Sequence, residues 1–483
     1  MATLTTTQTT GLRPSEKAMA IKSLVLAVTA LALGACNMPN EPNLNAPNVS
    51  DFSSITTLAQ VQNLVSGVLR GDRLHAENSI IEGEIIGRDL LNLTNSEDRW
   101  ETQLLGPRVD PSGFLGGRIW PYGNIRLANI GIDGVAAAPA ALLGAQDKPA
   151  TLGFLQTLKA LEYLRAIETR DTAGAPINVD IDPLAPPAPL SCKHDVLNSI
   201  AAQLDAAAVN LAAGGAAFPF SVPADFAGFD TPAGFLKFNR GLAAKTQVYL
   251  AFRNYAATAA IDAAALTAAQ TALTASFMDS TKAIGLGPSH DYSTNTGDAQ
   301  NSLFDGGPSS TTYFANQRVT AEADLNDARV SRKLVAGTPT TVALETGNQV
   351  YVVYAGPTSP TPLLTNKELM LLQAEVFWGQ ANYTGALAYA NVLRVHDGGL
   401  AADANVTPAS VLNRILYEKR YSLLFESGDR WYDARLFGTL NGSNPPAGIG
   451  TERTYAPIEN IPLPFNEQSA RFFNVTQTCT SGP

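Results

Sequence analysis

The stretch that decides the fold reads YEKRYSLLFESGDRWYDARLFG and spans residues 417–438. Charged residues alternate in it with aromatic and aliphatic ones. A segment so rich in apolar residues predicts a packed structural cluster rather than an exposed ligand site. We expect arginine over aromatic rings and the following ion pairs: Glu426 with Arg430 or Arg435, and Asp433 with Arg420.

Helical patterns precede this stretch along the chain. Thr407 and Pro408 open a helix that runs to about Glu426, with proline at its first position. Thr365 and Glu368 have capping-box spacing at the start of another apolar helix. Apolar residues at helical spacing predict further helices within 58–68, 118–135, 151–168, 194–211, 235–258, 262–283 and 383–394.

Two of these helices share a short internal repeat. Residues 247–255 and 375–383 match at valine, an aromatic residue and Asn-Tyr in the same register. The pattern resembles tetratricopeptide units, which bury their apolar faces by stacking on neighbours; the alternative is chance similarity between alanine-rich helices. We therefore predict a mainly α fold of stacked tetratricopeptide-like helix pairs with a few short strands.

Long polar insertions separate the helices. Within one of them, residues 342–354 predict a small strand pair that turns at Gly347 and Asn348. Long loops on a helical scaffold are typical of binding proteins. The expected insertions span 71–117, 172–192, 214–234, 285–364 and 439–483.

The amino terminus has the pattern of an export signal. Basic residues precede an uncharged apolar stretch, and Leu-Gly-Ala stands directly before Cys36. This resembles a bacterial lipoprotein signal at 1–35, with Cys36 as the lipidated first residue; the alternative is an ordinary secretory signal. Either Met1 or Met19 could be the start. The Asn- and Pro-rich segment 36–51 predicts a flexible tether, followed by one domain over 52–483.

Charge and composition exclude several classes of function. The chain has 483 residues and a formal net charge of −10, which disfavours nucleic-acid binding. No apolar run reaches the roughly 20 residues of a membrane-spanning helix. With Cys36 lipidated, Cys192 and Cys479 remain, and an oxidising compartment leaves their pairing open.

Catalytic and metal-binding motifs are absent from the sequence. It contains no G-x-S-x-G, H-E-x-x-H or P-loop pattern, and its four histidines are far apart. Asp180 and Asp182 could donate oxygens to calcium, although a solvated turn is favoured. We therefore expect no catalytic residue, no metal and no cofactor apart from this weak calcium candidate. A pair of facing carboxylates cannot be recognised by spacing alone.

The 417–438 stretch resembles the signature of the SusD/RagB family of outer-membrane nutrient-binding lipoproteins. Ser422 stands where the family usually has a second acid, and the spacing from Glu426 to Arg430 is one residue longer than the commonest form. The matching positions are Glu418, Arg420, Leu423, Phe425, Glu426, Gly428, Arg430, Trp431, Asp433 and Arg435.

Other segments resemble the same family in the same order. Residues 122–129 resemble an early Tyr…Asn helix, and 327–329 resemble its Asp-Pro-Arg element with alanine for proline. Residues 366–400 resemble its penultimate helix pair, and 458–467 resemble its closing Ile-Pro segment.

The resemblance implies a non-enzymatic function. Family members are lipid-anchored in the outer membrane, face the cell exterior and form a lid on a TonB-dependent barrel transporter, to which they deliver an oligosaccharide or a peptide. Two insertions offer aromatic and polar side chains suited to sugars, and we expect Trp100 and Tyr292 to contact the ligand first. The candidate ligand-binding residues are Asn95, Asp98, Arg99, Trp100, Tyr292, Asn295, Phe304 and Tyr313.

Two other functions remain open from the sequence. An envelope lipoprotein hydrolase would need a convergent acid pair or a nucleophile in a cleft, together with turnover of glycans or peptides. A structural surface protein would use its repeats for assembly and would expose a broad apolar patch.

Overall fold

The structure of the protein is a computed structural model, and it describes residues 52–105, 109–110, 118–179, 182, 184–440 and 458–480. The expected signal, Cys36 and the tether lie outside the described residues, and so does Asp180. The described residues all fall within one compact unit.

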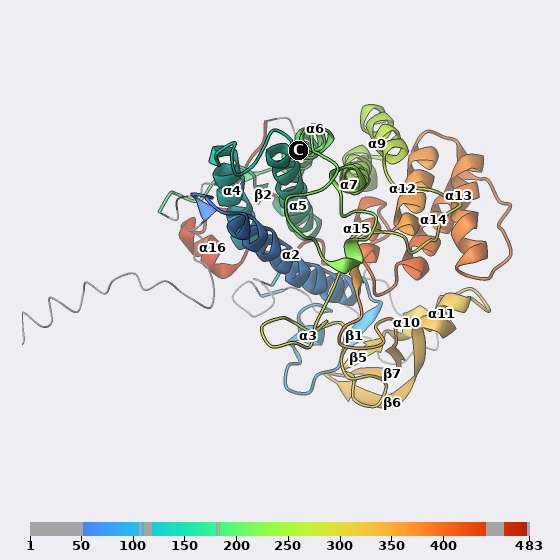
Figure 1. Cartoon of the computed structure of the whole chain (residues 1–483). Coiled ribbons are helices and arrows are strands. Elements are labelled where there is room, and N and C mark those ends of the chain that lie inside the picture. The colour runs from blue at the N-terminus through green and yellow to red at the C-terminus, as the bar shows by residue number, and fades with distance from the viewer. Residues whose placement is uncertain are drawn as a thin grey trace, which may run out of the picture. The chain divides into compact units, whose positions relative to one another are not determined.

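Helices make up most of this unit (Figure 1). None of the described helices is long and apolar enough to cross a membrane. The longer helices are α2 (Leu58–Ile86), α4 (Tyr122–Ala137), α5 (Asp147–Arg170), α6 (Lys193–Ala212), α7 (Pro232–Phe252), α9 (Ala263–Ala275), α12 (Asn366–Gly379), α13 (Tyr383–His396), α14 (Pro408–Ser422) and α15 (Asp429–Leu436). The short ones are α3 (Arg99–Thr102), α8 (Tyr255–Thr258), α10 (Gln317–Ala321), α11 (Ala328–Lys333) and α16 (Phe465–Ala470).

The helices stack in sequence order as antiparallel neighbours. Helix α5 packs on α6, α6 on α7, α7 on α9, α12 on α13, and α13 on α14 (Figure 1). Val248 and Val376, which the internal repeat aligns, are both fully buried. The rings of Phe252 and Trp378 pack with centroids 5.9 Å apart, which joins the two repeats. The predicted mainly α fold of stacked helix pairs is confirmed.

Helix starts follow their capping residues, whereas helix ends differ from the predictions. Thr365 Oγ1 accepts from Glu368 N at 3.4 Å, and Thr407 Oγ1 accepts from Ser410 N at 3.4 Å. Helix α14 ends at Ser422 rather than at Glu426, because the chain turns through residues 423–428. Helices α7 and α9 also end earlier than predicted.

The insertion predicted at 71–117 is wrong over its first part, where α2 continues to Ile86. The polar residues that suggested a loop are buried on this helix, among them Asp72, Glu77, Glu82 and Glu84. Side chains from distant segments bind some of these polar residues. For example, Arg165 Nε donates to Asp72 Oδ1 at 2.9 Å. A helix with charged residues on its inner face has the hydropathy pattern of a loop, so the sequence misleads at this point.

The insertion at 285–364 contains most of a small sheet with strand order β1-β5-β7-β6. The strands are β1 (Leu90–Asn92), β5 (Tyr313–Ala315), β6 (Leu334–Val342) and β7 (Glu345–Tyr351), and all neighbours are antiparallel. One smaller sheet pairs β4 (Ser289–His290) with β8 (Thr361–Pro362). In the other, β3 (Leu190–Ser191) lies between β2 (Ala175–Pro176) and β9 (Gln477–Thr478).

The predicted strand pair exists, but its turn was misplaced. The hairpin of β6 and β7 turns at Ala343 and Leu344, which have φ values of 51° and 75°. Both values lie in the left-handed region that a two-residue hairpin turn requires. Gly347 lies inside β7, where a Cβ atom would be 2.6 Å from Phe314 Cγ. That glycine permits close packing of the strand on the Phe314 ring instead of forming a turn.

The 417–438 stretch forms a buried ionic cluster, with partners other than those predicted. Glu426 Oε1 lies 2.8 Å from Lys333 Nζ, and its other oxygen contacts Lys367. Asp433 Oδ1 lies 2.7 Å from Lys419 Nζ. Because α14 ends before Glu426, pairs at helical spacing across the turn are not formed.

Arginines of this stretch reach other parts of the chain. Arg420 Nη2 lies 2.5 Å from Asp89 Oδ1, at the end of α2. Arg435 Cζ lies 4.1 Å from the Trp431 ring centroid, which confirms the predicted arginine–aromatic contact. The stretch is therefore a structural cluster, as predicted.

Cys192 and Cys479 form a disulfide with their Cα atoms 5.2 Å apart, within the usual range. Cys192 precedes α6, and Cys479 follows β9. The bond links the carboxyl-terminal segment to the start of α6. The pairing that the sequence left open is therefore formed.

Candidate ligand site

The first predicted ligand loop, residues 92–103, mostly packs on its own core. Trp100 is only 6% exposed, and the Arg118 guanidinium carbon lies 4.9 Å from its ring centroid. The Trp100 ring therefore presents no open face to a ligand in this structure. Arg99 is half-buried and pairs with Glu97, whereas Asn95 and Asp98 are exposed.

The second predicted loop, within 288–314, likewise contains both buried and exposed candidate residues. Tyr292 is 7% exposed, its hydroxyl donates to Thr361 Oγ1 at 3.0 Å, and the Arg73 guanidinium carbon lies 5.1 Å from its ring centroid. Phe304 and Tyr313 are half-buried against the core around the small sheet. Asn295 is exposed.

A groove of about 370 Å³ lies beside this second loop. We call it the α2 groove. The structure brings together three segments that are far apart in the sequence: one face of α2, a turn before α7, and the loop after β4. The lining residues are Gln62, Ser66, Leu69, Arg70, Arg73, Ser221, Val222, Pro223, His290, Asp291 and Asp298.

Sequence reasoning missed the α2 wall of the groove. Gln62, Ser66, Arg70 and Arg73 follow one another at intervals of four, four and three residues, which places them on one helical face. This polar stripe along the first half of α2 was the signal available in the sequence. Only the fold shows that the stripe faces a loop rather than open solvent.

Arg73 fixes the loop against α2. Its Nη1 donates to Asp291 O at 2.8 Å, and its Nη2 donates to Asp298 Oδ1 at 2.7 Å. Partial burial alone would raise the pKa of Asp298, but the hydrogen bond from Arg73 holds that pKa below its ordinary value. The ion pair therefore persists at neutral pH and gives the loop one position.

The lining residue His290 belongs to a buried hydrogen-bond network. His290 Nε2 lies 2.7 Å from Asp72 Oδ2, and Arg165 Nε donates to Asp72 Oδ1 at 2.9 Å. Asp72 and His290 are almost completely buried. Because these groups bind one another, the polar side chains that are accessible to a ligand are the exposed ones of the lining.

The rim offers groups of both hydrogen-bonding kinds. Arg70 and Ser66 are exposed donors on α2, and Asp291 supplies acceptors opposite. Burial and the neighbouring Asp291 charge raise the pKa of Asp225, which lies outside the lining of the groove. Leu69, Val222 and Pro223 add apolar wall. Such a groove can bind a small polyhydroxylated or zwitterionic molecule, and its volume lies within the usual range for ligand pockets.

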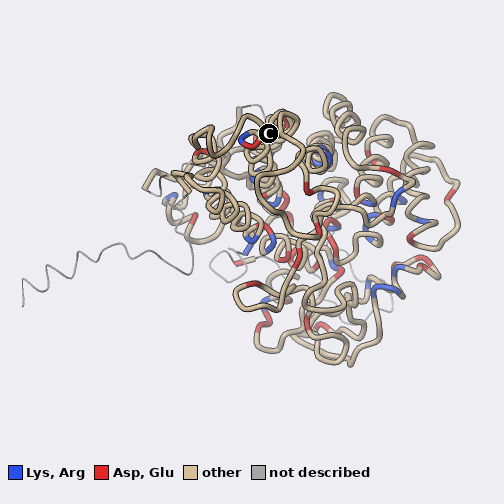
Figure 2. Tube along the Cα trace, in the orientation of Figure 1, with Lys and Arg blue, Asp and Glu red and all other residues tan. Residues whose placement is uncertain are grey.

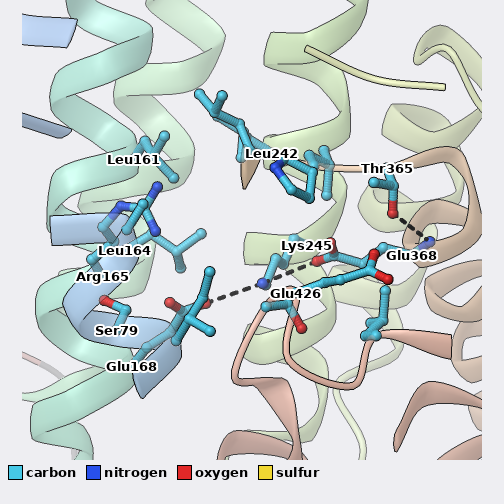
Figure 3. A pocket seen from close by; sticks show the side chains of 17 residues that line it. Ser79, Leu161, Leu164, Arg165, Glu168, Leu242, Lys245, Thr365, Glu368 and Glu426 are labelled. Atoms are coloured by element: carbon cyan, nitrogen blue, oxygen red, sulfur yellow. Dashed lines mark hydrogen bonds and ion pairs between the residues drawn. The ribbon is translucent and has the colours of Figure 1, made fainter. Parts of the chain in front are cut away.

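A second cavity lies in the interior and is much smaller, about 40 Å³ (Figure 3). Lys245 Nζ lies there 3.4 Å from Glu168 Oε1, 3.0 Å from Glu368 Oε1 and 3.1 Å from Asp429 Oδ1. Its size suits a few water molecules. We interpret it as a hydrated structural ion cluster rather than a ligand site.

Charged residues of both signs are spread over the described part of the chain. In the view of Figure 2, basic and acidic residues are intermixed rather than gathered on separate faces. Among the described residues, no group of three or more His, Cys, Asp or Glu side chains could hold a metal ion. The calcium candidate is not tested, because Asp180 lies outside the described residues.

Stacked helix pairs with a small sheet and a loop-walled groove define a SusD-like fold, and solved structures bear this out. A SusD superfamily protein from Parabacteroides distasonis ATCC 8503 matches with a TM-score of 0.67 and 13% identity, covering 86% of this chain and 98% of that chain. Surface glycan-binding protein A from Bacteroides thetaiotaomicron matches with a TM-score of 0.65 and 14% identity, covering 88% and 99%.

A third similar structure is B. fragilis NanU, with a TM-score of 0.56, 14% identity and coverage of 83% and 92%. No protein-family model and no curated protein sequence matches the chain. At these identities the structural likeness establishes the fold, and the fold that the signature resemblance implied is confirmed.

Proposed function

We propose that this protein is a SusD-type nutrient-binding lipoprotein of the cell surface that captures a short oligosaccharide in the α2 groove. The observation that carries the proposal is the groove itself, which joins a polar face of α2 to a loop fixed by Arg73. The SusD-like fold supports it, because one protein with that fold is named a surface glycan-binding protein.

The groove chemistry favours a short glycan over a long one. Its lining residues include no Phe, Tyr or Trp side chain, whereas long glycans are commonly held on several stacking platforms. Hydroxyl, amide, guanidinium and carboxylate groups around an aliphatic wall suit a sugar ring with its hydroxyls. Of the candidates named from the sequence, the exposed Asn295 on the loop after β4 remains proposed as a contact.

Binding is tested by titrating immobilised protein with a panel of short oligosaccharides and, in parallel, of short peptides. We expect one or more oligosaccharides to bind, and Arg70→Ala to weaken that binding at least tenfold. Lys237→Ala, an exposed lysine on α7, is the matched control and should leave binding unchanged. Binding of peptides alone, or equal affinity of the Arg70→Ala protein, would overturn the proposed ligand class or site.

We also propose that Cys36 carries the lipid anchor in the outer membrane and that the protein delivers its ligand to a TonB-dependent barrel. Incorporation of a labelled fatty acid into the wild-type protein but not into Cys36→Ala tests the anchor. Co-purification with a barrel protein from detergent extracts tests the partner. An unlabelled wild-type protein contradicts the first proposal, and a clean monomer in the extracts contradicts the second.

We propose that the protein breaks no bond in its ligand. Incubation of the bound oligosaccharide with the protein should return it intact, as judged by mass spectrometry. Turnover abolished by a substitution in the groove would instead identify a hydrolase, and ligand-independent polymers would favour the structural surface protein.

A further inference from the structure

The carboxyl-terminal segment exposes a group of large apolar side chains. We call Phe465, Phe472, Phe473 and Val475 the C-terminal aromatic patch. They are 45%, 93%, 59% and 46% exposed, respectively. The rings of Phe465 and Phe473 lie with centroids 5.8 Å apart, so they form one surface rather than scattered exposed residues.

The fold holds these rings in solvent. Phe472 and Phe473 have φ values of 52° and 59°, a left-handed conformation that bulky side chains rarely adopt. Directly after them, β9 pairs with β3, and the Cys192–Cys479 disulfide closes the segment. A strained pair of phenylalanines is thus fixed at the surface by strand pairing and a covalent bond.

The surroundings of the patch carry little charge. Residues 472–480 contain no charged side chain, and neither do residues 184–190, which lie alongside. Arg471 at the border donates to Ala188 O and pairs with Glu467, so its charge is neutralised within the protein. Leu184 in the neighbouring segment is 90% exposed. The carboxylate of Asp195 lies at the far end of the segment, where it accepts hydrogen bonds from Thr480.

We propose that the C-terminal aromatic patch rests in the interface of the lipid bilayer to which the protein is anchored. Phenylalanine rings beside Asn, Thr and Gln suit the boundary between headgroups and acyl chains. An acidic protein can approach an anionic membrane through a face that carries no net charge. The proposal rests on the proposed lipid anchor, because a tethered body needs only weak additional contacts to adopt one orientation on the membrane.

The tether allows this contact. Residues 37–51 separate Cys36 from the first described residue, and fully extended they span at most about 50 Å. With that reach, the patch can meet the same bilayer that holds the lipid on Cys36. The contact then determines which side of the folded domain faces away from the bilayer. It thereby also determines the orientation of the α2 groove.

The experiment uses the chain from Cys36 onward, which contains the whole compact unit. Cys192 and Cys479 are paired, so the Cys36 thiol alone can be coupled to a maleimide lipid in phosphatidylcholine vesicles. A reporter tryptophan is placed by Phe472→Trp or, as a control, by Leu325→Trp at another exposed site. Coupling is carried out at two densities, one of them too sparse for two copies to meet on one vesicle.

We expect brominated lipid to quench the emission of the tryptophan at 472 by roughly half or more, because the ring lies at acyl-chain depth. The tryptophan at 325 should not be quenched beyond the background from the four native tryptophans. Equal quenching of the two reporters would overturn the proposal. So would quenching at 472 only at high protein density, which would identify a second copy as the occupant. Because the maleimide supplies the anchor, neither failure depends on ligand binding or on lipidation in the cell.

Discussion

Arg329 Nη1 lies 2.6 Å from Glu418 Oε2, and neither side chain is exposed to solvent. Arg329 also binds both carboxylate oxygens of Asp327 and the hydroxyl of Ser422. Ser422 stands where the family resemblance leads one to expect a second acid. Here Asp327 supplies the additional carboxylate, and the Arg329 guanidinium links α11 to α14.

Removing one partner of this pair should destabilise the protein strongly. In Glu418→Ala, the buried guanidinium loses an ionic partner, and we expect the free energy of unfolding to fall by about 3–5 kcal/mol. Urea denaturation measures the change. Asp205→Ala is the control, because the Asp205 side chain is 67% exposed in its ion pair with Arg240, and its loss should cost less than about 1 kcal/mol. Equal losses in the two variants would contradict this account of the buried pair.

Glu82 should make the protein less stable as the pH rises. The side chain is fully buried on α2, and burial raises its pKa from 4.5 to about 8 despite the nearby Arg118. Between these values the folded protein keeps a proton that the unfolded chain has lost. The free energy of unfolding should therefore fall with increasing pH, by up to about 1.4 kcal/mol per pH unit from this group.

Substitution isolates that contribution. Glu82→Gln should flatten the slope of stability against pH between about pH 5 and pH 7.5, as measured by urea denaturation at several pH values. Asp205→Asn, which alters an exposed carboxylate, should leave the slope unchanged. An unchanged slope in Glu82→Gln would mean that Glu82 is ionised in the folded protein.

Gly347 should tolerate no side chain. A Cβ atom there would overlap the Phe314 ring across the β5–β7 pair, and Gly347→Ala should cost about 1–3 kcal/mol through overpacking. Gly356→Ala is the matched control, since nothing lies within 4 Å of its added Cβ. Equal melting temperatures for the two variants would show that the hairpin moves freely away from Phe314.

Loss of the disulfide should act locally. In a Cys192→Ser, Cys479→Ser protein, we expect faster amide hydrogen exchange in residues 472–480, because only short strand contacts remain there. Exchange in α5 and α7 should not change. Faster exchange spread over the stacked helices would contradict this, because it would mean that the bond holds the whole domain together.

Much of the fold could be predicted from local features of the sequence. Capping residues at Thr365 and Thr407 act within a few residues of the chain, so they mark helix starts without tertiary information. Apolar periodicity likewise predicted α5 and α6, whose buried faces are continuous. The signature stretch also showed by its composition that it is structural.

Tertiary structure decided what depends on distant partners. The sequence predicted charge pairing around 417–438, but Arg420 meets Asp89 and Glu426 meets Lys333, from segments whose approach no spacing reveals. The second half of α2 resembled a loop because its carboxylates are neutralised or hydrogen-bonded only in the folded protein. Trp100 was a reasonable ligand candidate in sequence, because only the fold shows that its side chain lies in the core. The α2 groove exists only because the fold lays the loop after β4 against a polar helix face.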